Sequence, residues 1–320
     1  MRPPSPLPAG PAPQDQETVP PVPPAGPDRS VLVGIGLMCL AVTAFSMLDA
    51  TAKWLSPQVG VVMVVWARYV THLLLSLAVF NPWTVPGLMR TSRPGLQILR
   101  STLMLAITVL NFTALLYLQL DQTVSLMFSS PFFVALFAGP LLGEWIGARR
   151  WAAILVGFTG IILVVRPGAG GIHPAALLCL AGAACYALYA IITRMLAATD
   201  KSATTLFYSA LVGSIAASLP LPFAWHLPET PLAAIALVAL GVFGGFGHFM
   251  LILAHNRAPA ARLAPFVYTQ IISMVALGWL FFGQVPSGWT LAGAAVVIGS
   301  GIYLLFLEHR ERRVKPTEVR

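Results

Sequence analysis

The sequence predicts an all-α membrane protein with ten transmembrane helices in two inverted five-helix repeats. Hydrophobic residues make up 57% of the 320-residue chain and charged residues only 9%, whereas a soluble domain carries about 25% charged residues. Ten apolar stretches follow one another with short connections, and blocks of the first half recur in the second half. A chain with so few charges cannot cover a water-exposed surface, so these observations favour a polytopic membrane protein.

Each apolar stretch is long enough to cross the hydrocarbon core of a bilayer, for which roughly 20 residues suffice. Backbone groups in lipid must be satisfied within the segment, and an α-helix achieves this. The predicted spans cover residues 31–52, 59–80, 97–118, 123–142, 150–166, 174–194, 204–221, 232–254, 262–282 and 289–307.

The two ends of the chain differ from this apolar body. Residues 1–30 contain eleven prolines and no apolar run, which predicts a disordered cytoplasmic tail rather than a signal peptide. Residues 308–320 form a short basic tail. Between the tails we expect two domains, a first repeat over 31–168 and a second repeat over 169–307.

The basic residues predict that both termini lie in the cytoplasm of a bacterial inner membrane. With the N-terminus inside, fourteen lysines and arginines fall on the inner side, and only Lys53 and Arg166 fall on the outer side. Cytoplasmic loops of membrane proteins carry such an excess. An odd number of spans would place the basic C-terminal tail outside, so the asymmetry favours an even number. Charges at the membrane boundary point to the lipid bilayer as a partner and not to nucleic acid.

An internal repeat organises the spans. Three blocks recur at offsets of 140 or 141 residues: 44–53 with 185–194, 131–144 with 271–284, and 157–165 with 298–306. A unit of five helices enters the membrane from opposite sides in its two copies. Repeats inverted in this way typically enclose a substrate site near the membrane midplane.

Two segments resemble a known family. They are TVSLMFSSPFFVALFAGPLLGEWIGARRWAAILVGFTGIILVVRPG at 123–168, and 253–305 from LAHNRAPAARLAPFVYTQ to GSGIYLL. Both are similar to the EamA-type family of the drug/metabolite transporter superfamily, and with Lys53 and Arg68 the resemblance covers about 31–307. It implies a secondary transporter that moves a small organic metabolite by alternating access.

The chain departs from the family pattern in its second repeat. Ile271 and Gln284 stand where the family usually has a proline and a glutamate. Any role of that second glutamate therefore cannot be carried over to this chain.

Three stretches look most like bacterial riboflavin importers within this family: NFTALLYLQLDQTVSLMFSSPFFVALF, GGIHPAALLCLAGAACYALYAIITRML and LFYSALVGS. This resemblance implies riboflavin uptake as the first expectation for the substrate. Related branches resemble exporters of amino acids and other metabolites, so export stays an alternative. Proton-coupled and facilitative transport are equally compatible with the sequence, which makes no prediction of oligomeric state.

Two charged residues lie deep inside predicted spans, where charges are costly and often functional. Arg68 lies about 13 Å into the second span at 1.5 Å per residue, and Asp49 is the only acid that we place inside a span. They predict either a substrate contact or a structural ion pair between adjacent helices. His72, one turn beyond Arg68, and His248 are candidates for a proton relay or for hydrogen-bonded packing.

Aromatic and amide side chains near mid-membrane complete the expected substrate site. They are Trp66, Tyr69, Asn111, Tyr186, Tyr189, Tyr268 and Gln270. A planar, partly apolar ligand suits aromatic walls with a few amide groups. Helix packing alone would explain any one of these residues, so the predicted substrate site depends on all of them together.

Other residues predict structural or gating roles. Pro131 and Pro265 interrupt two spans, which can mark a hinge, a ligand site or a scaffold element. Glu144, Arg149 and Arg150 at the inner membrane boundary predict an anchor, with a gate as the alternative. Four glycines of one span, Gly241, Gly244, Gly245 and Gly247, predict close helix packing.

The sequence offers no evidence for catalysis. The three cysteines lie in apolar segments without CxxC spacing, which predicts buried structural thiols. Neither a nucleophile and base set nor a metal-ligand pattern is visible, so we expect no enzyme, no metal and no cofactor. A membrane-embedded enzyme and a non-transporting scaffold are the remote alternatives.

Overall fold

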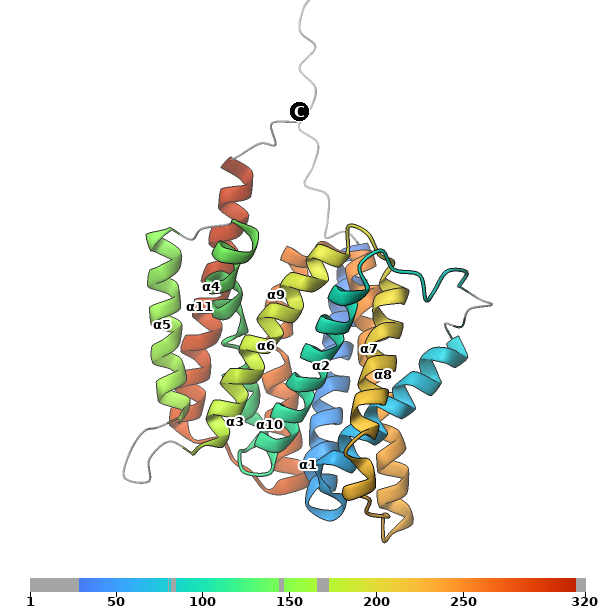
Figure 1. Cartoon of the computed structure of the whole chain (residues 1–320). Coiled ribbons are helices and arrows are strands. Elements are labelled where there is room, and N and C mark those ends of the chain that lie inside the picture. The colour runs from blue at the N-terminus through green and yellow to red at the C-terminus, as the bar shows by residue number, and fades with distance from the viewer. Residues whose placement is uncertain (1–28, 80, 82–84, 144–146, 166–172, 315–320) are drawn as a thin grey trace, which may run out of the picture.

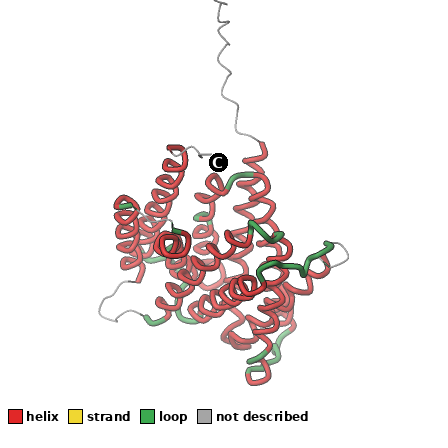
Figure 2. The backbone as a smooth tube through the Cα atoms, turned by 45° about the horizontal axis from the view of Figure 1, so that its top comes forward, coloured by secondary structure: helices red, strands yellow, loops and turns green. Residues whose placement is uncertain are grey.

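The computed structural model describes residues 29–79, 81, 85–143, 147–165 and 173–314. Within these ranges the chain is helical with short connections and contains no strand, as Figure 2 shows. Residues 1–28 of the predicted N-terminal tail and residues 315–320 of the C-terminal tail lie outside the described residues, whereas Arg29 and Ser30, which were assigned to the tail, already belong to the first helix. The predicted domain boundaries stay predictions.

The helices divide between the two halves of the chain (Figure 1). The first half contains α1 (Arg29–Val79), α2 (Pro94–Leu115), α3 (Leu120–Met127), α4 (Ser130–Leu142) and α5 (Ala148–Val165). The second half contains α6 (Ala175–Leu196), α7 (Ser202–Ser218), the 3₁₀ helix η1 (Leu221–Phe223), α8 (Pro231–Arg257), α9 (Ala260–Val267), α10 (Gln270–Phe282) and α11 (Gly288–Val314).

The first helix is too long for a single span. Its 51 residues would extend about 75 Å at 1.5 Å per residue, whereas the hydrocarbon core is about 30 Å thick. Gly60 divides it, because its φ of 79° and ψ of 151° are not helical and suit glycine. The predicted spans 31–52 and 59–80 therefore correspond to the two arms of α1.

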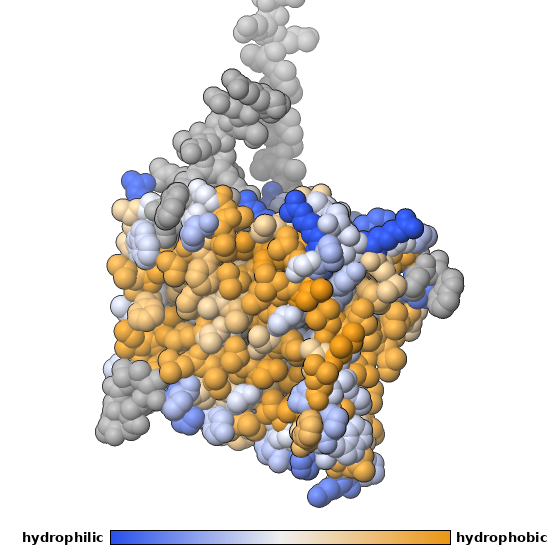
Figure 3. All heavy atoms as spheres, in the orientation of Figure 1, coloured by the Kyte–Doolittle hydropathy of each residue, from blue (hydrophilic) through white to orange (hydrophobic). Residues whose placement is uncertain are grey.

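The described helices confirm the all-α membrane class. Eight helical segments are long and apolar enough to cross a membrane, and Gly288–Leu304 adds a shorter apolar helix. Every predicted span coincides with a helical segment, but the total of ten stays a prediction, because the described helices give eight candidate spans and one shorter apolar helix. Figure 3 shows an apolar belt on the visible face, with polar residues gathered at its upper and lower edges.

The backbone repeats itself as the sequence predicts. Helices α3 and α9 have eight residues each, and α4 and α10 have thirteen each, with the second copy 140 residues later. Gly143 and Gly283 end α4 and α10 in the same left-handed conformation, with φ of 71° and 62°. The chain rises from α3 to α4 and descends from α9 to α10 in Figure 1, so the two repeats are inverted.

Two equivalent helices, α5 and α11, pack against each other. A Cβ atom at Gly160 would lie 2.8 Å from the carbonyl oxygen of Gly293, and one at Gly293 would lie 2.6 Å from that of Gly160. At the symmetry-related contact, the Ser300 hydroxyl donates a hydrogen bond to the Ala153 carbonyl. The helix backbones therefore touch where both residues are glycine.

Glycines of α8 bring both arms of α1 into the centre of the bundle. A Cβ atom at Gly241 would lie 2.7 Å from the backbone nitrogen of His72, and one at Gly247 would lie 2.7 Å from the Phe45 ring. A Cβ atom at Gly244 would contact the Arg68 side chain at 3.7 Å. This close packing places Arg68 and the nearby polar side chains inside the protein.

Candidate functional site

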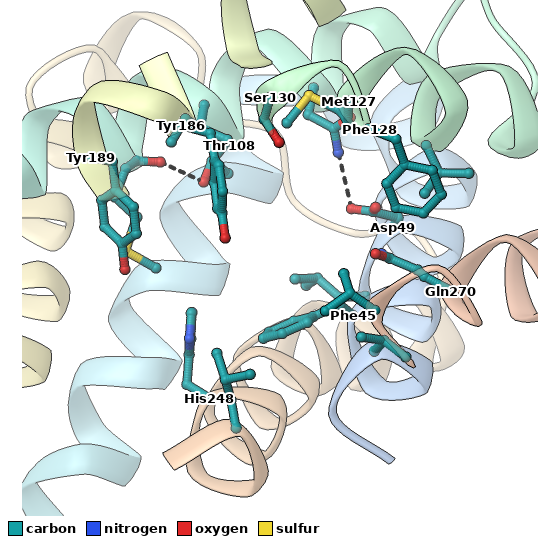
Figure 4. A pocket seen from close by; sticks show the side chains of 18 of the residues that line it. Phe45, Asp49, Thr108, Met127, Phe128, Ser130, Tyr186, Tyr189, His248 and Gln270 are labelled. Atoms are coloured by element: carbon teal, nitrogen blue, oxygen red, sulfur yellow. Dashed lines mark hydrogen bonds between the residues drawn. The ribbon is translucent and has the colours of Figure 1, made fainter. Parts of the chain in front are cut away.

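A cavity of about 300 Å³ lies between the two repeats, and we call it the central cavity. Both arms of α1, with α2, α3 and α4, supply one part of its wall, and α6, α8, α9 and α10 supply the other. Seven of the ten predicted substrate-site residues line it: Asp49, Arg68, Asn111, Tyr186, Tyr189, His248 and Gln270. Figure 4 shows Asp49 and Gln270 on one side of the cavity and the two tyrosines on the opposite side.

Asp49 is held by an amide from a neighbouring helix. The Asn111 Nδ2 of α2 donates a hydrogen bond of 3.1 Å to Asp49 Oδ1 (Figure 4). Ser130, which begins α4, and Gln270, which begins α10, also line the cavity. Carboxylate, amide and hydroxyl groups from both repeats therefore converge on one space.

Arg68 and Asp49 both line the cavity, and each forms its hydrogen bond with a side chain of α2 rather than an ion pair with the other. Arg68 Nη1 donates to the Thr108 hydroxyl, and the guanidinium lies 5.1 Å from the Tyr69 ring centre and 5.7 Å from that of Phe112. These contacts hold the guanidinium against α2. Its Nε is buried without a hydrogen-bond partner, so some bonding capacity of the cation remains unused.

Three predicted site residues pack elsewhere, which corrects their assignment to the cavity. Trp66 Nε1 donates to the Ser218 hydroxyl at 3.0 Å, away from the cavity. Tyr69 is 1% exposed, and its ring occupies the space beside Gly213. Tyr268 lies edge-on to Phe128, with ring centres 4.9 Å apart. All three rings fill gaps between helices, as the packing interpretation allowed.

The two histidines stack on each other. The rings of His72 and His248 lie 5.7 Å apart at an interplanar angle of 15°. The Nε2 atoms of both are buried without a hydrogen-bond partner. Only His248 lines the central cavity, so the pair extends from the cavity wall into the packing behind it.

Sequence reasoning missed two buried charged residues. Arg100 is 6% exposed, and its Nη2 donates to the Tyr189 hydroxyl at 2.5 Å. Asp121 is 4% exposed at the start of α3, and its Oδ2 has no hydrogen-bond partner. Asp49 is therefore not the only acid inside a span. Arg100 lay within the predicted span 97–118, so the argument applied to Arg68 would have found it.

Lys53 joins α1 to the end of α2. Its ammonium group donates hydrogen bonds to the carbonyl oxygens of Leu115 (2.6 Å) and Leu118 (2.7 Å). It also lies 5.8 Å from the centre of the Phe282 ring, at the end of α10. A cation at a helix C-terminus satisfies carbonyls that lack partners within the helix.

The structure describes four of the five residues for which we predicted structural or gating roles. Pro131 lies in the first turn of α4, and Pro265 lies within α9. Arg149 is exposed and Arg150 is half-buried at the start of α5. Glu144 lies outside the described residues, so the choice between an anchor and a gate stays a prediction.

Potential metal ligands and thiols are scattered in the part of the chain that the structure describes. No group of three His, Cys, Asp or Glu side chains there is placed to hold a metal ion. Cys39, Cys179 and Cys185 are free thiols.

The fold and the cavity define a class of protein, a polytopic membrane protein whose two inverted repeats enclose a central cavity. The EamA-like transporter family matches residues 32–166 and 173–307, and the chain belongs to this family. The match confirms the resemblance stated for segments 123–168 and 253–305. The chain is therefore a membrane-embedded transporter of a small metabolite.

Several relatives are similar along most of this chain. A riboflavin transporter of Rhizobium johnstonii is 31% identical, over 90% of this chain and 95% of the relative. An S-adenosylmethionine uptake transporter of Rickettsia conorii is 28% identical, over 88% and 95%. A pseudopaline exporter of Pseudomonas aeruginosa is 28% identical, over 85% and 95%. A solved crystal structure shares the fold, with 17% identity, a TM-score of 0.60, and coverage of 88% of this chain and 98% of that one.

Proposed function

We propose that the protein imports riboflavin across the inner membrane of a bacterium by alternating access. The observation that carries the proposal is the central cavity, which combines aromatic rings with the Asp49 and Asn111 pair. Relatives named riboflavin transporters, at 31% and 28% identity over most of the chain, support the same substrate.

The cavity chemistry suits a flat heterocycle with polar edges. Phe45, Phe128 and Tyr186 supply aromatic surface, which packs well against a planar ring. The free lone pairs of the Asp49 carboxylate can accept a hydrogen bond from a ring N–H group. The Gln270 amide lies on the same side and can pair with a ring carbonyl.

In this proposal the two repeats rock about their shared contacts. The α5 and α11 backbones touch at Gly160 and Gly293, which favours a pivot over a sliding interface.

Both termini lie in the cytoplasm, as the distribution of basic residues predicts. Alkaline phosphatase fused after Arg320 should then be inactive and a fusion after Thr230 active, and the opposite pattern would reject this orientation.

Flux in proteoliposomes tests the substrate. Purified protein should carry labelled riboflavin with saturable kinetics, and unlabelled amino acids and nucleosides should not compete. Growth of a flavin-auxotrophic bacterium that lacks its own importer should improve at low external riboflavin. Absence of both effects, with folded protein in the membrane, would reject riboflavin as the substrate.

S-adenosylmethionine uptake is the second candidate. The Asp49 carboxylate faces Tyr186 and Tyr189 across the cavity (Figure 4), and the ring centres of the two tyrosines lie 5.8 Å apart, so a sulfonium cation held between the acid and the rings would also suit the site. The Rickettsia relatives of that name support this alternative. Labelled S-adenosylmethionine in the same proteoliposomes separates the two, since uptake of this compound alone would replace the riboflavin proposal.

A further inference from the structure

A second cavity of about 310 Å³ adjoins the central one. It lies at the start of α2 and α7 and at the end of α6 and α8. Met104, Tyr189, His248 and Leu251 line both cavities. The two spaces are therefore neighbours along one route through the bundle, with these four side chains at the junction.

The two cavities differ in chemistry. The central cavity is lined largely by apolar and aromatic side chains. Beyond the junction, the second cavity is lined by more hydrogen-bonding side chains than the central one, including Ser202, His255 and Asn256, and we call it the polar cavity. A ligand that filled both spaces would need an apolar part and a hydrogen-bonding part.

Bonding capacity remains unused at the junction itself. The Tyr189 hydroxyl accepts a hydrogen bond from Arg100, so its own proton remains available for an acceptor. The His248 Nε2 atom is buried without a partner. A buried polar atom without a partner is unfavourable, so a ligand group that bonded it would gain affinity.

Arg100 fixes the position of Tyr189. Its Nη2 donates to the tyrosine hydroxyl at 2.5 Å, and its guanidinium carbon lies 4.3 Å from the ring centre. The same guanidinium donates to the hydroxyls of Thr193 at 2.7 Å and Ser209 at 2.5 Å. Because these bonds tie α2 to α6 and α7, Arg100 is a positioning residue for Tyr189.

Asp200 lies at the far end of the polar cavity, in the loop between α6 and α7. Desolvation raises its pKa, but hydrogen bonds from Thr91 at 2.5 Å and Gln97 at 2.6 Å outweigh this effect and hold the pKa below its usual value. The ionised carboxylate favours ligand groups that donate hydrogen bonds.

We propose that the polar cavity is a second substrate subsite, which holds a hydrogen-bonding tail while the flat ring of the same molecule occupies the central cavity. The substrate class is thus a planar heterocycle with an attached chain of hydroxyl or amino groups. This inference rests on the proposed function, because the ribityl chain of riboflavin is such a tail.

The subsite is tested by removing the tail from the ligand and the Tyr189 hydroxyl from the protein, separately and together. Affinities of riboflavin and of lumiflavin, which keeps the three-ring system without the ribityl chain, would be measured by flavin fluorescence in nanodiscs. Tyr189→Phe keeps the ring and removes only the hydroxyl. It should weaken riboflavin binding about tenfold, as loss of one hydrogen bond in a buried site allows, and leave lumiflavin binding within about twofold.

Two further variants sharpen this comparison. Asn111→Ala, which changes the central cavity alone, should weaken both flavins to the same degree. Arg100→Gln should weaken riboflavin binding but not lumiflavin binding, as Tyr189→Phe does. Arg100→Lys, which keeps the positive charge, should weaken riboflavin binding less than Arg100→Gln. If Arg100→Gln does not fold, Tyr189→Phe alone decides.

The outcomes separate the subsite from the riboflavin proposal. Equal weakening of both flavins by Tyr189→Phe, or no weakening of either, would overturn the subsite. If the native protein binds neither flavin, riboflavin is rejected as the substrate. The same comparison is then made with S-adenosylmethionine, which has a tail, and adenine, which has none. Absence of a tail-dependent effect, or of any binding, in that second pair overturns the subsite as well.

Discussion

The break between α3 and α4 and the break between α9 and α10 have the same backbone but different side chains. The Ser129 hydroxyl donates to the Leu126 carbonyl at 2.6 Å, and the equivalent Thr269 hydroxyl donates to the Phe266 carbonyl at 2.6 Å. The first break is followed by Pro131, whereas Ile271 occupies the same place after the second. Both copies nevertheless bend at equivalent residues.

This difference shows that a proline directly after the break is not needed to form it. Proline removes a backbone donor and is tolerated in the first turn of a helix, which is where Pro131 lies. Since the second break forms without a proline at that place, the shared hydroxyl and its bond to the backbone are the common feature. The scaffold is thus duplicated, while the side chains that face the cavity, Ser130 and Gln270, have diverged.

The largest expected loss of stability comes from the contact between α5 and α11. Gly160→Ala and Gly293→Ala each introduce a Cβ atom within 2.8 Å of a backbone oxygen, and overpacking of this kind costs about 1–3 kcal/mol. Melting temperature in detergent should fall by a similar amount for both variants, because they press on the same contact from its two sides.

Gly299→Ala is the matched control for this contact. A Cβ atom at Gly299 meets nothing within 4 Å, although the residue belongs to the same helix as Gly293. Alanine raises helix propensity by up to about 1 kcal/mol, so this variant should be neutral or stabilising. A control that melts as early as Gly293→Ala would contradict the close backbone contact.

Removal of the Ser129 or Thr269 hydroxyl should cause the next largest loss of stability. Ser129→Ala removes a buried hydrogen bond and Thr269→Val a partly buried one, and each bond contributes about 1 kcal/mol to stability. Thermal unfolding in detergent should show similar losses for the two variants. A loss confined to one of them would break the equivalence of the two repeats.

Pro131→Ala should have the smallest effect. Proline acts here through the unfolded state, so its removal costs at most about 1 kcal/mol, and the break persists as it does beside Ile271. Thermal unfolding together with riboflavin flux would measure this. A loss larger than that of Ser129→Ala would show that the first repeat depends on its proline.

The fold followed from the sequence more completely than the site did. Lipid requires long apolar helices, so hydropathy predicted the spans, and the repeat predicted their inversion. Hydropathy does not predict which neighbouring helix or cavity each side chain of a span will face. Trp66 and Tyr69 were therefore placed in the cavity with Arg68, although both pack against α7 or its end.

The missed charges have a related cause. Asp121 precedes the predicted span at 123–142, but α3 begins at Leu120 and buries it. The ion-pair alternative for Asp49 and Arg68 assumed that helices adjacent in the sequence bond each other. In the structure, α2 intervenes and supplies Asn111 to the acid and Thr108 to the cation.

The central claim is that the metabolite is carried through the central cavity and bound there by Asp49. Initial riboflavin uptake per folded molecule in proteoliposomes, for the native protein, Asp49→Asn and Asp121→Asn, tests it most directly. Both variants neutralise an acid within the helical bundle, Asp49 half-buried and Asp121 buried, but only Asp49 lines the central cavity. A hydrogen bond to a charged group contributes about 1.5–3 kcal/mol, so Asp49→Asn should lower uptake about tenfold or more, while Asp121→Asn retains it. Equal uptake by Asp49→Asn and the native protein would contradict the claim.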